Sequence, residues 1–74
     1  MERTEIEITT EFIKLDQLLK FSGIAENGGM AKAMISDGII SVNGEVCLLR
    51  GKKIHKNDVV TAEFEDGEIE ITVV

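Results

Sequence analysis

The sequence predicts an α+β domain in which two short helices pack on a small, mainly antiparallel sheet. Three patterns lead to this fold class. Residues 5–9 alternate polar and apolar side chains, as in a strand with one solvated face, and residues 14–36 carry two apolar stripes of helical period. Residues 39–73 hold two pairs of β-type runs, each joined by a turn signal. The expected order is β-α-α-β-β-β-β, in one domain over residues 1–74.

The first helix is predicted over residues 14–21. Leu15, Leu18 and Leu19 recur at the spacing that places side chains on one face of a helix. Gly23 follows at the position where a helix commonly ends in a left-handed residue. Because a helix of two turns is marginal alone, this leucine stripe is expected to be buried against the rest of the domain.

The second helix is predicted over residues 30–36. Asn27 precedes it and is a residue type that caps helix N-termini, and Gly38 is placed to end it. Met30 and Met34 are expected to pack in the core or between the helices. The apolar stripe of this helix consists of Ala31, Met34 and Ile35.

The remaining chain predicts two hairpins. Residues 39–49 read as two strands joined by Asn43 and Gly44, a pair that accepts the positive φ angles of a type I′ turn. Residues 59–73 read as a second hairpin with Asp66-Gly67 at its turn. Residues 50–57, a segment rich in basic side chains between the two hairpins, are predicted to form a loop or turn.

Charge is distributed unevenly along the chain. The formal net charge is −6, yet residues 14–56 hold seven bases against four acids. Residues 1–13 hold one Arg against four Glu, and residues 57–74 hold six acids and no base. This asymmetry predicts one basic surface on an otherwise acidic domain.

Composition argues against several classes of protein. The single cysteine, Cys47, cannot form an internal disulfide, which together with the absence of a signal-peptide pattern predicts a cytoplasmic protein. No apolar run approaches the ~18 residues of a membrane helix, so no membrane association is expected. Cys47 is expected to be a buried residue of a strand, and His55, which has no second ligand at metal-binding spacing, a surface loop residue. No cofactor is predicted.

Catalysis is not predicted either. Asp16 lies near the start of the first helix, where an acid stabilises the positive end of the helix dipole. A catalytic acid would need a second carboxylate or a nucleophile with its base, and neither pattern accompanies Asp16. The sequence therefore predicts a binding protein without a small-molecule substrate.

A set of short motifs occurs in one order along the chain: Lys14-Leu15-Asp16-Gln17-Leu18-Leu19-Lys20, Gly23, Ala31-Lys32, Ile35, Gly38, Val42-Asn43-Gly44 and Asn57-Asp58-Val59-Val60. This set resembles the S-four RNA-binding domain, also called the alpha-L motif, over about residues 12–62. The family pattern has Ser-Arg at the start of the second helix, where this chain has Asn27-Gly28-Gly29-Met30 and so lacks one expected arginine. The sequences from Gly28 to Lys32 and from Arg50 to Lys53 look like the small stand-alone bacterial subgroup.

The resemblance implies association with structured RNA, ribosomal or transfer RNA, or with the ribosome. The residues themselves support a phosphate-binding surface, because the Gly-Gly helix start offers free N–H groups and the lysines add charge. The three aromatic residues are all Phe, so reading of single strands by aromatic stacking is not expected. The predicted RNA-binding residues are Lys14, Lys20, Asn27, Gly28, Gly29, Lys32, Arg50, Lys52, Lys53 and Lys56.

Three alternatives remain open from the sequence. The basic residues also fit a solvated face that offsets the acidic strands, and Gly28-Gly29 also fits a tight turn between helices. A protein–protein adaptor without an RNA ligand, docking through an exposed sheet edge, is the alternative function.

Overall fold

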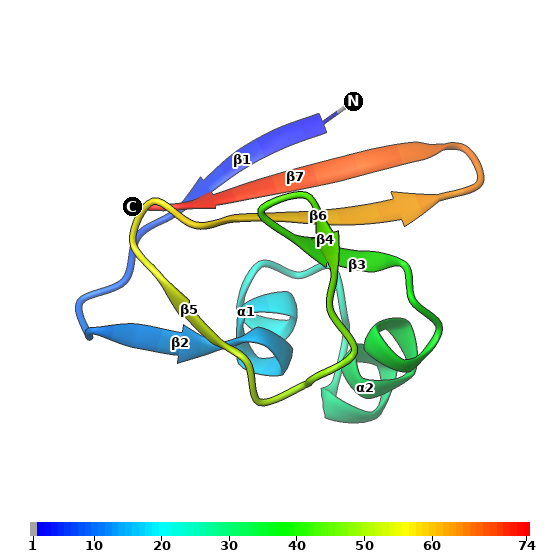
Figure 1. The fold of residues 1–74 in the computed structure, drawn as a ribbon, viewed down its shortest axis with the longest axis horizontal. Coiled ribbons are helices and arrows are strands. Elements are labelled where there is room, and N and C mark those ends of the chain that lie inside the picture. Colours follow the sequence, from blue (N-terminus) through cyan, green and yellow to red (C-terminus); the bar gives the residue numbers. More distant parts are fainter. Residues whose placement is uncertain (1) are drawn as a thin grey trace.

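A computed structural model of the protein describes residues 2–74 and confirms the α+β fold class (Figure 1). The described residues form two helices and seven strands. Their bounds are β1 Glu2–Ile6, β2 Phe12–Lys14, α1 Leu15–Phe21, α2 Gly28–Ser36, β3 Ile40–Val42, β4 Glu45–Val46, β5 Lys53–His55, β6 Val59–Phe64 and β7 Gly67–Val73.

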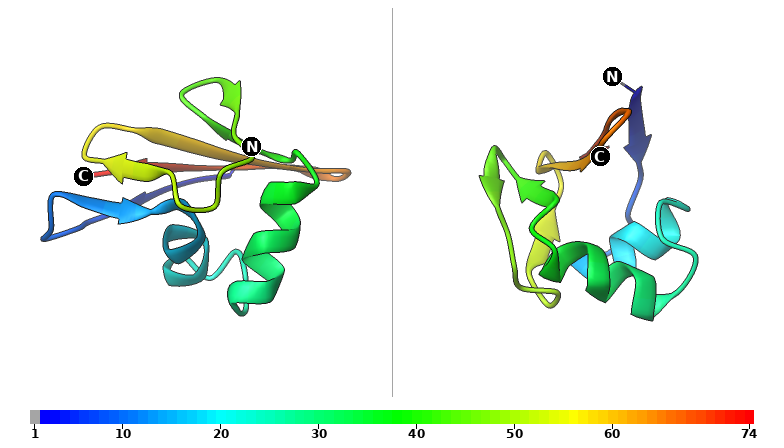
Figure 2. Two further views of the ribbon diagram at one scale, coloured as in Figure 1. Left: turned by 60° about the horizontal axis from the view of Figure 1, so that its bottom comes forward. Right: turned by 90° about the vertical axis from the view of Figure 1, so that its right-hand side faces the viewer.

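The strands form two sheets. The larger one has the order β1-β7-β6-β3-β4 and is antiparallel except for the β1–β7 pair, which is parallel. The smaller one is an antiparallel pair of β2 and β5. Both helices lie on the same side of the larger sheet, and the β3–β4 hairpin projects away from them (Figure 2).

The core lies between the helices and the larger sheet. The leucine stripe of α1 is fully buried, and Ala31, Met34 and Ile35 of α2 are buried beside it, as the helical spacing predicts. Alternate residues of the strands complete the same cluster, because every second side chain of a strand points to one face. These residues are Ile40, Val42, Ile54, Val60, Ala62, Ile71 and Val73.

The ends of α2 carry the capping residues that the sequence predicts. The Asn27 side chain caps α2 by accepting the Met30 N–H at 2.8 Å, although α2 begins at Gly28, earlier than predicted. Gly38 has a φ of 78° directly after the α2 C-cap, a conformation that glycine adopts without a steric penalty. Met30 is a partial exception to the predicted packing, since 43% of it is exposed.

Both predicted hairpins form, with two differences: the second strand of the first hairpin ends at Val46 rather than at Leu49, and the turn of the second is shifted. Asn43 and Gly44 have φ angles of 51° and 88°, the pattern of the predicted type I′ turn. In the second hairpin Phe64 pairs with Gly67, so the turn lies at residues 65–66 rather than at Asp66-Gly67.

The N-terminal strand lies earlier than predicted. The alternation of residues 5–9 suggested a strand there, but β1 covers Glu2–Ile6. The position of β1 is set by its parallel register with β7, in which Glu2 faces Ile69 and Ile6 faces Val73. This pairing is long-range, so local alternation could not define its ends.

The predicted loop at residues 50–57 contains a strand. β5 pairs with β2, which the sequence analysis did not predict, and the shared inward residues are Ile13 and Ile54. Each strand has three residues, too few to show an alternating pattern.

The predicted burial of Cys47 and the predicted loop position of His55 were wrong. Cys47 follows the end of β4, is only partly buried, and its thiol lies 3.7 Å from the Leu49 carbonyl oxygen. His55 is exposed as predicted, but it belongs to β5 rather than to a loop.

Candidate nucleic-acid interface

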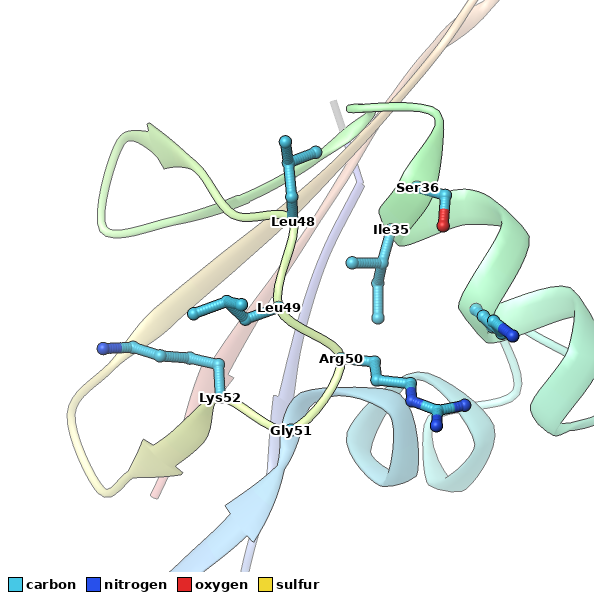
Figure 3. Close-up of a pocket in the computed structure, with 8 residues that line it drawn as sticks. Ile35, Ser36, Leu48, Leu49, Arg50, Gly51 and Lys52 are labelled. Atoms are coloured by element: carbon cyan, nitrogen blue, oxygen red, sulfur yellow. The ribbon is translucent and has the colours of Figure 1, made fainter.

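A groove of about 570 Å³ lies between α2 and the segment that joins β4 to β5 (Figure 3). Three of its lining residues are cationic, and none is acidic. Ile35 projects from α2 toward the segment, and the Arg50 side chain extends on the α2 side (Figure 3). We call this the helix groove; its lining residues are Lys32, Ile35, Ser36, Leu48, Leu49, Arg50, Gly51 and Lys52.

The segment that carries Arg50 and Lys52 is fixed by its backbone. The Leu15 N–H donates to the Lys52 carbonyl at 2.9 Å, and the Asp16 N–H donates to the Arg50 carbonyl at 3.1 Å. The first amides of α1 therefore bind this segment. Because the backbone is held, the Arg50 and Lys52 side chains are presented from a defined position.

A second groove, of about 560 Å³, lies on the other side of the same segment. It holds Lys52, Lys53 and His55, but also the carboxylates of Glu45 and Asp58. We call it the hairpin groove, since the β3–β4 hairpin forms one wall. Its other lining residues are Val42, Asn43, Val46, Cys47, Leu48 and Leu49.

Lys14 and Lys53 lie directly opposite each other in the β2–β5 pair. Like charges in this position destabilise a pair of strands. The Lys53 ammonium lies 4.9 Å from the centre of the Phe12 ring, which offsets part of this cost through a cation–π contact. An anion near both lysines would remove the repulsion.

The N-terminus of α2 is open to solvent. The Asn27 side-chain oxygen is used by the cap, whereas Gly28 and Gly29 are exposed. Neither glycine has a positive φ, so a tight turn between the helices does not require them. A Cβ atom at Gly28 would meet nothing within 4 Å, and one at Gly29 would lie 3.3 Å from the capping oxygen of Asn27.

The structure does not bring all the predicted residues to one place. Lys32, Arg50, Lys52 and Lys53 line the two grooves, and Lys14 faces Lys53. The other two bases are exposed and line neither groove: Lys20 in the last turn of α1 and Lys56 in the turn after β5.

Few charged side chains are paired on the folded domain. Within residues 2–74 only two ion pairs form, Arg3 with Glu70 at 3.7 Å and His55 with Asp58 at 3.7 Å. The seven Lys and Arg residues between positions 14 and 56 thus have no carboxylate within 4.0 Å among the described residues. By contrast, Glu68 and Glu70 alternate with the core-facing residues of β7 and so lie on the face opposite the helices.

A polar network that the sequence analysis missed joins the two turns near the hairpin groove. Asn43 accepts the Val59 N–H at 2.9 Å and donates from Nδ2 to Asp58 at 3.1 Å. Asp58 Oδ2 also accepts the His55 N–H at 2.7 Å. The Val-Asn-Gly and Asn-Asp motifs contain the side chains of this network. Asn43 and Asp58 are 15 positions apart in the sequence, so only the fold brings them together.

This network holds the pKa of Asp58 below its usual range. The main cause is the hydrogen bond from the His55 N–H, while partial burial acts in the opposite direction. The Asn43 amide and the positive charges of His55 and Lys52 lower the pKa further. The ionised form of Asp58 is therefore favoured in the folded state.

A pH dependence of stability follows from this shift. Since the folded pKa lies below that of the unfolded chain, about 4, the contribution is fully present above pH ~4 and is lost as pH falls through the folded value. Urea unfolding between pH 2 and 6 is expected to show a smaller loss at the acid end for Asp58→Asn than for the unchanged chain. Asp66→Asn, at the exposed β6–β7 turn, is the control. Identical acid limbs for all three proteins would contradict the assignment.

Residues 2–74 contain no group of three His, Cys, Asp or Glu side chains arranged to hold a metal ion. None of their helices is long and apolar enough to cross a membrane.

Comparison with known proteins identifies the family. The family model described as the S4 domain matches residues 6–72. A Bacillus subtilis (strain 168) protein named "Probable ribosome maturation protein RlbA" is 43% identical over 58 residues, which cover 78% of this chain and 82% of that protein. The residues quoted for the resemblance lie within the matched range. This chain belongs to the S4 domain family.

Proposed function

We propose that this chain is a non-catalytic RNA-binding protein that holds structured RNA by its backbone. The observation that carries the proposal is the helix groove, which Lys32, Arg50 and Lys52 line without any acidic residue. Three unpaired cations on a pre-formed surface are suited to neighbouring phosphates. Membership of the S4 domain family supports the same function.

The proposed target is ribosomal RNA, free or in a ribosomal particle, within the cytoplasm. The support is the name of the Bacillus subtilis relative, a probable ribosome maturation protein. No cofactor or small-molecule substrate is part of this proposal. The chain acts as one binding unit.

Different roles are proposed for the basic residues. Lys32, Arg50 and Lys52 bind phosphates in the helix groove, and Lys14 and Lys53 bind a further phosphate that relieves their mutual repulsion. The exposed amides of Gly28 and Gly29, together with the capping residue Asn27, accept a phosphate at the α2 N-terminus. Lys20 and Lys56 lie outside the grooves and contribute long-range attraction.

The adaptor alternative has less support. It requires a sheet edge that accepts another strand, and β1 is one edge of the larger sheet. This edge carries the charged residues Glu2, Arg3 and Glu5, and charged side chains discourage edge pairing.

Salt dependence tests the proposed function. Each phosphate contact contributes roughly −0.7 to −0.9 to the slope of log affinity against log salt, so about four contacts weaken binding by about two log units when salt rises fourfold. The measurement is fluorescence anisotropy of a labelled ribosomal RNA hairpin titrated at several KCl concentrations. A slope near zero would leave the adaptor as the better function.

A further inference from the structure

Two consecutive leucines are exposed on the segment between the grooves. Leu48 and Leu49 have 63% and 69% of their surface accessible, although both are large apolar residues. Each of them lines both the helix groove and the hairpin groove. We call this pair the leucine ridge. Apolar residues that gather in an exposed position beside polar residues mark interaction sites.

Cations flank the leucine ridge on both sides. Figure 3 shows Arg50 extending toward the α2 side, whereas Leu49 and Lys52 extend toward the other. Lys53 adds a further cation in the hairpin groove, and Lys32 adds one in the helix groove. The surface is thus apolar in the middle with cations on both sides, joined on the hairpin-groove side by the carboxylates of Glu45 and Asp58. Its complement is a flat apolar group with an anion on the helix-groove side, where no acidic residue lies.

We propose that the leucine ridge contacts an unpaired base of the bound RNA, whose neighbouring phosphate lies in the helix groove. This inference rests on the proposed function and names the RNA element that is bound. A fully paired stem presents phosphates but keeps its base faces stacked inside, so it offers nothing to Leu48 and Leu49. A bulged or looped-out nucleotide exposes a base face, and apolar side chains are used to contact unstacked bases.

The dimensions and charges favour this occupant. The helix groove, of about 570 Å³, falls within the range of volumes of sites that hold small organic ligands. A second copy docking helix groove to helix groove would bring Lys32 and Arg50 against a surface without acidic residues, and like charges in an interface cost several kcal/mol. A purely apolar protein segment would leave the same cations unused.

The experiment compares two RNA hairpins with the same stem, one fully paired and one with a single bulged nucleotide. Affinities are measured by fluorescence anisotropy for the unchanged protein, for Leu48→Ala/Leu49→Ala and for Phe21→Ala. Phe21 is the matched control, because it is 67% exposed and lines neither groove. Thermal unfolding of each variant shows that the fold is kept.

The unchanged protein is expected to bind the bulged RNA about tenfold more tightly than the paired RNA, a difference of about 1.4 kcal/mol in binding free energy. In the double leucine variant the ratio of the two affinities falls toward one, and in Phe21→Ala it is kept. Equal affinities of the unchanged protein for both RNAs would overturn the inference and leave the proposed function intact. Absence of binding to either RNA would overturn both. A change of sedimentation mass in the leucine variant would show that the ridge joins protein copies instead.

Discussion

Reversing the charge of Lys32 and Lys52 together is expected to weaken RNA binding by about 100-fold. Both residues line the helix groove and neither has an acidic partner within 4.0 Å among the described residues. Lys32→Glu/Lys52→Glu removes two phosphate contacts and places two carboxylates where phosphates are proposed to lie. The fold is expected to persist, because the Lys52 carbonyl rather than its side chain holds the segment to Leu15.

The matched control is Lys20→Glu/Lys56→Glu. Each change of lysine to glutamate lowers the charge by two units, so both double variants take the formal net charge from −6 to −10. Since Lys20 and Lys56 line neither groove, the control is expected to lose only the several-fold affinity that long-range attraction supplies. Anisotropy with the same RNA and co-sedimentation with ribosomal subunits measure both variants. Equal losses would show that net charge, and not the helix groove, determines binding.

The helical half of the fold could be predicted from the sequence because its signals are local. The spacing of Leu15, Leu18 and Leu19 places them on one face of α1, and the structure buries all of them. The Asn27 cap and the type I′ turn at Asn43 and Gly44 are also determined by neighbouring residues. Such features depend on backbone preferences that a single sequence displays.

Pairings between distant residues could not be predicted in the same way. The parallel β1–β7 pair joins residues more than 60 positions apart, and its register set the ends of β1. The β2–β5 pair consists of three-residue strands without a pattern of their own. In both cases the partner strand supplies the information that the local sequence lacks.

The candidate site, too, could be predicted from the sequence only in part. The charge asymmetry indicated a basic surface, but residue type alone could not separate Lys32, which lines a groove, from Lys20, which does not. The leucine ridge was missed because residues 47–49 were predicted to continue a strand, while β4 ends at Val46. Once the strand ends, Leu48 and Leu49 no longer face a core and become exposed.

The buried leucine stripe carries the largest expected effect on stability. Leu18 of α1 is fully buried in the core. Leu18→Ala removes buried methyl groups and leaves a cavity, which costs about 2–5 kcal/mol in the free energy of unfolding. A domain of this size has a total stability of roughly 4–11 kcal/mol, so the variant is expected to unfold at a much lower temperature.

The control is Leu48→Ala, the same chemical change at a residue that is 63% exposed, which is expected to alter stability by no more than about 0.5 kcal/mol. Thermal and urea unfolding followed by circular dichroism measure both variants. Equal stabilities for the two would mean that α1 does not pack on the sheet through Leu18, and the position of the Arg50 segment, which α1 holds through Leu15 and Asp16, would then have to be revised.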